Sequence, residues 1–203
     1  MPQIRDALAG QISRETYIAY LGEAYHHVRF TVPLMMAAGA RLPASKEWLR
    51  TALVEYIEEE HGHEEWILND IAKAGGDADA VRNGQPGLAT ELMVSYVFDY
   101  VSRRNPVGLF GMVYVLEGTS TELATPAAEA LMKSLALPKD CFSYLLSHGS
   151  LDLEHIAFFE ELVNKLDDAE DRRAVLHVCR VVFGLFGDLF RSIPHGTELK
   201  NAV

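Results

Sequence analysis

Residues 147–159 read SHGSLDLEHIAFF and place His148, Asp152 and His155 at intervals of four and three residues. Successive residues of an α-helix are rotated by about 100°, so these three side chains project from one narrow stripe. An apolar run follows the stripe directly. We therefore predict a helix that turns two imidazoles and a carboxylate toward a partly buried face. The alternative is a solvated helix face with two incidental histidines.

The helical period recurs along the whole chain, with apolar residues at every third or fourth position. No segment shows the alternation of a strand bounded by hairpin turns. The pattern predicts an all-α bundle of about six or seven helices. Neither half offers enough helices to close a core, so we expect residues 1–203 to form a single domain. The expected helices cover about 13–40 with a kink or break at Pro33, 45–74, 88–104, 107–136 with a bend at Pro126, 139–166 and 168–193, with a long loop at 75–87.

Composition narrows the classes of function. The 203-residue chain has a formal net charge of −11, which disfavours nucleic acid and anionic membranes as partners. No apolar segment reaches the roughly 20 residues of a membrane helix, and the N-terminus lacks a signal-peptide pattern. Two cysteines without a CxxC pair favour a reducing compartment. We expect a cytoplasmic protein with a small-molecule substrate, and the long bundle helices favour a homodimer.

A second helix offers metal-ligating side chains. Residues 55–70, EYIEEEHGHEEWILND, contain Glu60 and His63 at the Glu-x-x-His spacing of di-metal centres in helical bundles. Glu59, four residues before His63, would share that face equally well. The alternative is a solvated acidic face, because the segment is rich in carboxylates.

A third helix offers Glu117 after a largely apolar run, where a lone carboxylate is costly unless it is paired, protonated or bound to a metal. The alternative is a buried glutamate that Ser120 or a tyrosine hydroxyl satisfies. Together the three helices offer three carboxylates and three imidazoles, enough for two metal ions. Such donors suit iron, manganese and zinc, and the choice of metal stays open, as does one ion or two. The six candidate ligands are Glu60, His63, Glu117, His148, Asp152 and His155.

The chain resembles the haem-oxygenase-like superfamily, which includes the TenA thiaminase-type proteins, PqqC and the diiron oxidases of the CADD and UndA type. The resemblance covers nearly the whole chain and rests on YLGEAYHHVRFTVPL, EEEHGHEEWILND, NPVGLFGMVYVLEGTS and SHGSLDLEHIAFFEEL. It is closest to the diiron oxidases, which carry a Glu/His pair on one helix, a lone Glu on the next core helix and HxxxDxxH on a third. It implies a haem-oxygenase-like fold, two irons per chain held by the six candidate ligands, and dioxygen as co-substrate.

One departure concerns the first glutamate. Relatives place it three or seven residues before its histidine, and the residue seven before His63 is Tyr56, so only the shorter spacing fits. TenA-type thiaminases use a cysteine nucleophile, and neither Cys141 nor Cys179 lies in the motifs, which disfavours thiaminase activity. PqqC binds an anionic quinone through basic residues, of which the motifs have few.

The pair His26-His27 supports a second interpretation, in which the chain binds haem instead of two irons. Haem oxygenases take their proximal ligand from a histidine of the first helix. A haem at His27 would leave the acids of the ligand set unexplained, so haem is the less favoured cofactor. Tyr25 is a speculative catalytic residue that would donate a hydrogen atom.

The favoured interpretation is an iron-dependent enzyme that activates dioxygen to oxidise a small organic substrate. Two other classes stay open. The same pocket could bind haem, a thiamine-like pyrimidine or another small ligand without turnover, or the chain could be a helical interaction module with solvated acids. The sequence leaves the substrate and the reaction subtype open.

Overall fold

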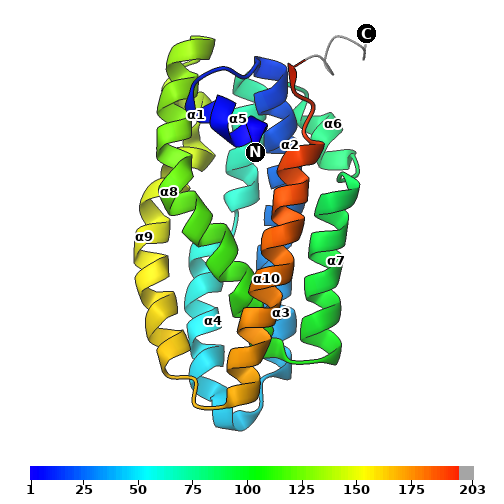
Figure 1. Ribbon diagram of the computed structural model, residues 1–203, viewed down its shortest axis with the longest axis vertical. Coiled ribbons are helices and arrows are strands. Elements are labelled where there is room, and N and C mark those ends of the chain that lie inside the picture. Colours follow the sequence, from blue (N-terminus) through cyan, green and yellow to red (C-terminus); the bar gives the residue numbers. More distant parts are fainter. Residues whose placement is uncertain (197–203) are drawn as a thin grey trace.

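The computed structural model describes residues 1–196, with only the backbone described for 149–155. This part of the chain consists of α-helices and short 3-10 turns without a strand, so the predicted all-α class is confirmed. Most of the long helices run along the long axis of the molecule (Figure 1). The α-helices are α1 (Pro2–Leu8), α2 (Arg14–Val28), α3 (Thr31–Arg41), α4 (Glu47–Glu60), α5 (His63–Lys73), α6 (Ala78–Asn83), α7 (Leu88–Arg103), α8 (Leu109–Leu135), α9 (Ser143–Asn164) and α10 (Ala169–Ser192).

The first predicted helix, at 13–40, is divided into α2 and α3. Ser13 caps α2, because its hydroxyl accepts a hydrogen bond from the Thr16 amide at 3.1 Å. α2 ends at Val28 and α3 begins at Thr31, so Pro33 lies in the first turn of α3. The amides of a first turn have no partner within the helix, so a proline there removes no hydrogen bond. The break therefore falls just before Pro33.

The second predicted helix, at 45–74, is interrupted at Gly62. Gly62 has a φ of 93°, a left-handed conformation that glycine adopts without a Cβ clash. α4 therefore ends at Glu60 and α5 begins at His63. The Glu-x-x-His pair spans a boundary between two helices, which corrects the expectation that both residues lie on one helix.

The rest of the chain follows the predicted order. α7, α8, α9 and α10 occupy the predicted ranges, and α8 continues through Pro126. The predicted loop at 75–87 contains the short helix α6. Asp77 caps the N-terminus of α6, because its carboxylate accepts a hydrogen bond from the Ala80 amide at 2.9 Å. Among the described residues, no helix combines the length and the apolar character needed to cross a bilayer.

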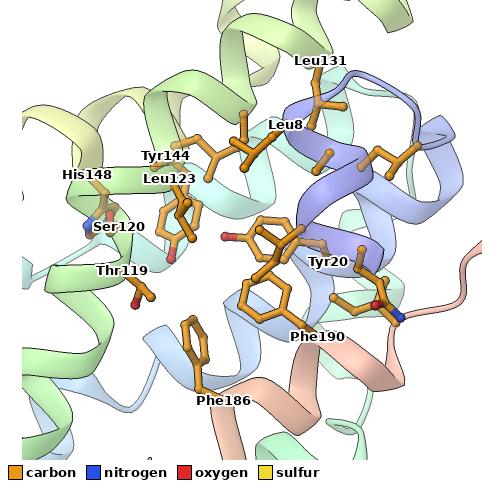
Figure 2. Close-up of a pocket in the computed structure, with 18 of the residues that line it drawn as sticks. Leu8, Tyr20, Thr119, Ser120, Leu123, Leu131, Tyr144, His148, Phe186 and Phe190 are labelled. Atoms are coloured by element: carbon orange, nitrogen blue, oxygen red, sulfur yellow. The ribbon is translucent and has the colours of Figure 1, made fainter. Parts of the chain in front are cut away.

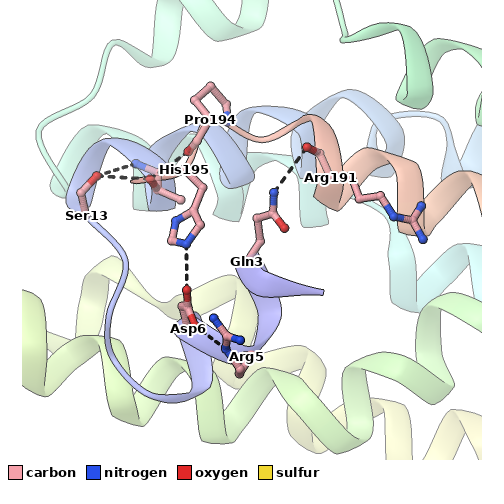
Figure 3. A network of polar contacts seen from close by, with 8 residues as sticks. Gln3, Arg5, Asp6, Ser13, Arg191, Pro194 and His195 are labelled. Atoms are coloured by element: carbon pink, nitrogen blue, oxygen red, sulfur yellow. Dashed lines mark hydrogen bonds and ion pairs between the residues drawn. The ribbon is translucent and has the colours of Figure 1, made fainter. Parts of the chain in front are cut away.

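α1 has no counterpart in the predicted helices. It lies against α8 and α10, and polar contacts tie it to the end of α10 (Figure 3). His195 Nε2 lies 2.9 Å from a carboxylate oxygen of Asp6, and the Gln3 amide donates to the Arg191 carbonyl at 3.3 Å. These contacts place a short helix from the start of the chain against the far end of the last helix.

The core consists of two apolar clusters along the bundle. The first involves α3, α4, α7 and α10, and the second involves α2 and α5, while α8 and α9 contribute to both. Along α8, Val115 belongs to the first cluster and Ala124 to the second, with Glu117 between them. The chain passes from the first cluster to the second again between α4 and α5, at Glu60 and His63. The candidate ligands thus lie where the two clusters meet.

Candidate metal centre

Three of the predicted ligands come together inside the bundle. The ligand atoms of Glu60, His63 and His148 all lie within 4.8 Å of one another. Glu60 Oε2 is 3.2 Å from His63 Nδ1. Glu60 ends α4, His63 begins α5 and His148 lies on α9, so three separate helices supply the donors. A carboxylate and two imidazoles at such distances form a cluster that could bind a divalent cation.

The helix boundary explains which glutamate joins the cluster. Glu60 is buried, with 7% of its surface exposed, whereas the neighbouring Glu59 is exposed. The turn at Gly62 then reverses the chain direction enough for the His63 side chain to lie beside the Glu60 carboxylate. The geometry therefore favours Glu60 over Glu59 as the carboxylate of this cluster.

Aromatic rings surround the two imidazoles. Trp66 stacks on His63 with ring centroids 4.0 Å apart, and Tyr144 meets His148 edge-on at 4.6 Å. The two imidazoles themselves are nearly perpendicular, with centroids 5.0 Å apart. The sequence interpretation did not name Trp66 or Tyr144 as residues of the site, although their spacings of three and four residues from the histidines place them on the same helix faces. Such packing fixes the planes of the imidazoles.

Glu117 lines a cavity of about 70 Å³ together with Glu60 and His148. It is buried, with 9% of its surface exposed, and it lies outside the tight three-residue cluster. No Lys or Arg side chain lines this cavity among the described residues. A divalent cation would balance the two carboxylates that face the cavity.

The other two predicted ligands are Asp152 and His155. Both belong to α9, one and two turns after His148, and their side chains lie outside the described residues. The described donors are therefore two carboxylates and two imidazoles. Nitrogen and oxygen donors of this kind suit iron, manganese or zinc.

His27 and Tyr25, the two residues outside the ligand set, have different surroundings. His27 is buried and lines the cavity that Glu60, Glu117 and His148 also line. Burial lowers the pKa of His27 to about 3, with His148 and His26 adding to the effect. Tyr25 packs in the second apolar cluster and does not line this cavity. The speculative role of Tyr25 therefore has no geometric support.

A carboxylate that the sequence interpretation passed over, Asp70, holds the start of α9. It is completely buried on α5 and accepts hydrogen bonds from the Ser143 amide at 3.1 Å, the Ser143 hydroxyl at 2.5 Å and the Tyr144 amide at 2.8 Å. Burial raises the pKa of Asp70, and the hydrogen bonds from Ser143 and Tyr144 oppose that rise. Asp70 thus fixes the first turn of α9, one turn before His148.

The two cysteines take no part in the centre. Cys141 is buried in the second apolar cluster, and Cys179 packs against the first. Neither lines the cavity of Glu60 and Glu117, and burial raises the pKa of both thiols. A raised pKa disfavours the thiolate that a cysteine nucleophile requires.

The fold and the buried cluster define an all-α bundle with carboxylate and imidazole donors between its helices. A family model described as "iron-containing redox enzyme" matches residues 18–185, which is most of the chain. The chain therefore belongs to this family of iron-containing redox enzymes. No curated protein matches the sequence.

Solved structures show the same fold. A domain of unknown function with a haem-oxygenase-like fold from Shewanella denitrificans superposes with a TM-score of 0.84 at 24% identity, over 95% of this chain and 83% of that one. A TenA homologue from Pseudomonas syringae gives a TM-score of 0.77 at 12% identity, over 94% of this chain and 84% of that one. A TenA homologue from P. horikoshii gives a TM-score of 0.72 at 10% identity, over 94% of this chain and 90% of that one. The predicted superfamily is confirmed by these likenesses and by the family model.

Proposed function

We propose that this chain is an iron-dependent oxidoreductase that activates dioxygen and oxidises a small organic substrate. The observation that carries the proposal is the gathering of Glu60, His63 and His148 from three helices, with their ligand atoms within 4.8 Å of one another. Membership of a family of iron-containing redox enzymes makes iron the metal to expect.

We infer that the full ligand set is larger than this cluster. Glu117 adds a carboxylate from α8 on the wall of the same cavity. Asp152 and His155 would add a carboxylate and an imidazole from α9, as in diiron oxidases of the CADD and UndA type. Six ligands leave coordination positions open at two irons for dioxygen or substrate. We therefore propose two irons per chain, and a single ion or manganese is the alternative.

When bound, iron would supply the redox chemistry that activates dioxygen. Glu60 and Glu117 supply negative charge, and His63 and His148 supply nitrogen donors. The contacts of Trp66 with His63 and of Tyr144 with His148 hold the two rings in fixed planes, so the donor atoms are preorganised.

We infer that the remaining wall of the cavity of Glu60 and Glu117 keeps bulk water away from a bound metal. It is largely apolar and comes from α2, α3 and α8. A dry cavity strengthens electrostatic interactions inside it and prevents side reactions with water. The apolar wall residues are Val28, Leu34, Met35, Leu109, Met112, Val113 and Leu116.

The test is an anaerobic titration with ferrous iron, in which the irons bound per chain are counted, followed by exposure to dioxygen with observation of the visible spectrum. We expect the wild type to bind two irons and to give a transient visible band. Glu60→Ala, Glu117→Ala and His148→Ala should each lose at least one iron. Glu59→Ala removes an exposed acid next to Glu60, and it should bind iron like the wild type.

Failure of the wild type to bind ferrous iron, or equal iron uptake by all variants, would contradict the proposal. The haem-binding alternative predicts a different result. It requires a Soret band on addition of haem that His27→Ala removes and His148→Ala retains.

A further inference from the structure

A second cavity, of about 120 Å³, lies next to the candidate metal centre, and we refer to it as the larger cavity. Its walls come from α1, α2, α8, α9 and α10. Figure 2 shows Ser120 and His148 on one side of it, with Phe186 and Phe190 on another. The larger cavity adjoins the cavity of the metal centre, because the two share the lining residues His27, Leu116, Ser120, Tyr144 and His148.

The walls of the larger cavity are without charge. No Lys, Arg, Asp or Glu side chain lines it in the part of the chain that the structure describes. Aliphatic and aromatic side chains make up most of the surface, including Leu8 from α1, Leu123 from α8 and Phe190 from α10. Burial of an ionised group without a partner is strongly unfavourable. These walls therefore disfavour a ligand that places a charge among them.

At the junction of the two cavities, the buried atoms His27 Nδ1 and Ser120 Oγ have no hydrogen-bond partner among the described residues, and neither does Gln3 Oε1, which lies on the α1 wall away from the junction. His27 and Ser120 both line the larger cavity and the cavity of the metal centre. In contrast, the hydroxyls of Thr16 and Thr119, also on the wall, donate to backbone carbonyls. Buried polar groups nearly always have partners in folded proteins. A ligand with one polar group where the two cavities meet would provide hydrogen-bond partners for His27 and Ser120.

The protonation state of His27 agrees with an uncharged ligand. Its pKa of about 3 leaves the imidazole neutral near pH 7. A neutral imidazole donates one hydrogen bond and accepts one, and it offers no positive charge to a carboxylate.

We propose that the larger cavity binds an uncharged, largely apolar molecule whose single polar group reaches His27 and Ser120. The inference depends on the proposed function in one respect, since it makes this molecule the substrate of the adjacent metal centre. The apolar body fills the space between α1 and α10, and the polar group lies at the junction with the cavity of Glu60 and Glu117.

The test compares 1-octanol with octanoate, which share a chain length and differ in charge. Each is titrated by calorimetry into the full chain in the presence of EDTA. We expect 1-octanol to bind at least about 10-fold more tightly than octanoate, because the carboxylate finds no cationic partner in the cavity. Equal binding of the two, or tighter binding of octanoate, would overturn the inference.

Two pairs of variants locate the binding. Ala127→Phe fills the larger cavity and should abolish the binding of 1-octanol, whereas Ala72→Phe makes the same change on the exposed face of α5 and should not. Ser120→Ala should weaken the binding of 1-octanol by about 3-fold to 10-fold through the loss of one hydrogen bond. Ser134→Ala, on the same helix and outside the cavity, should have no effect.

Circular dichroism and melting temperature show that each variant is folded. Unchanged binding of 1-octanol to folded Ala127→Phe would overturn the inference, as would unchanged binding to Ser120→Ala. Because EDTA removes metal, this result is independent of the ferrous titration. Binding of 1-octanol without iron uptake would leave the cavity assignment intact and refute the proposed function.

Discussion

At the scale of single residues, Asp70 shows how one buried carboxylate orders a distant part of the candidate centre. It joins α5 to the first turn of α9 through three hydrogen bonds, two of them from backbone amides. Those amides have no acceptor within their own helix, because they belong to its first turn. His63 begins the helix that carries Asp70, and His148 follows the capped turn. The Asp70 side chain therefore helps to fix the positions of His63 and His148 relative to each other.

We expect Asp70→Ala to lower the free energy of unfolding by about 2 to 4 kcal/mol, because it leaves the buried amide of Tyr144 and the half-buried amide of Ser143 unsatisfied. Asp77→Ala removes a helix cap of the same type from an exposed position and should cost about 1 kcal/mol. Urea unfolding of both variants measures the difference. Equal losses for the two variants would show that Asp70 is only an ordinary cap.

At the scale of elements, the packing of α8 on α10 requires a glycine. A Cβ atom added at Gly111 would lie 2.3 Å from the Val175 carbonyl oxygen and 2.6 Å from the Cys179 amide nitrogen. Both atoms belong to the backbone of α10, so they cannot move without the helix. The close approach places the first half of α8, which carries Glu117, firmly against the bundle.

Gly111→Ala should therefore destabilise the protein by about 3 kcal/mol, because the two helices must separate to admit one methyl group. Gly184, on α10, provides the matched control, since a Cβ there would meet nothing within 4 Å. Gly184→Ala should stabilise the protein by up to about 1 kcal/mol through its higher helix propensity. Thermal unfolding of both variants tests these two expectations. Equal losses of stability in Gly111→Ala and Gly184→Ala would contradict the explanation by helix packing.

At the scale of the whole molecule, the stability of the metal-free protein should depend on pH through His27. Burial lowers the pKa of His27 to about 3 in the folded state, against about 6.5 in an unfolded chain. Between these values the unfolded state binds a proton that the folded state excludes. The free energy of unfolding therefore falls as the pH falls below 6.5, and it continues to fall until the pH reaches the folded pKa.

Between pH 7 and pH 5 we expect His27 to account for a loss of about 2 kcal/mol. Urea unfolding in EDTA at the two pH values measures it, with His27→Gln as the reference, because that variant keeps every other titrating group. The wild type should lose more stability than His27→Gln. Equal losses would mean that His27 takes up a proton within the fold.

Assembly is also a property of the whole molecule, and the homodimer stays a prediction. Several large apolar side chains are exposed in the described part of the chain, among them Leu88, Leu92 and Phe183. Sedimentation velocity would decide between a monomer and a dimer.

The sequence by itself determined the fold class and the helices that carry the candidate ligands. Helical periodicity and residue type are local properties, so His148 and Glu117 could be placed on helices without knowledge of their neighbours. The helix end before the predicted loop at 75–87 was an equally local signal, because α5 ends at Lys73, just before two consecutive glycines.

Tertiary structure decided which side chains face one another. The choice of Glu60 over Glu59 and the cap that Asp70 places on α9 depend on segments that are far apart in sequence. The walls of the larger cavity join α1 to α10, from the two ends of the chain. Periodicity gives the face of each helix, but the rotation and position of one helix against another arise from the packing of all of them, because the apolar clusters form only when the whole bundle closes.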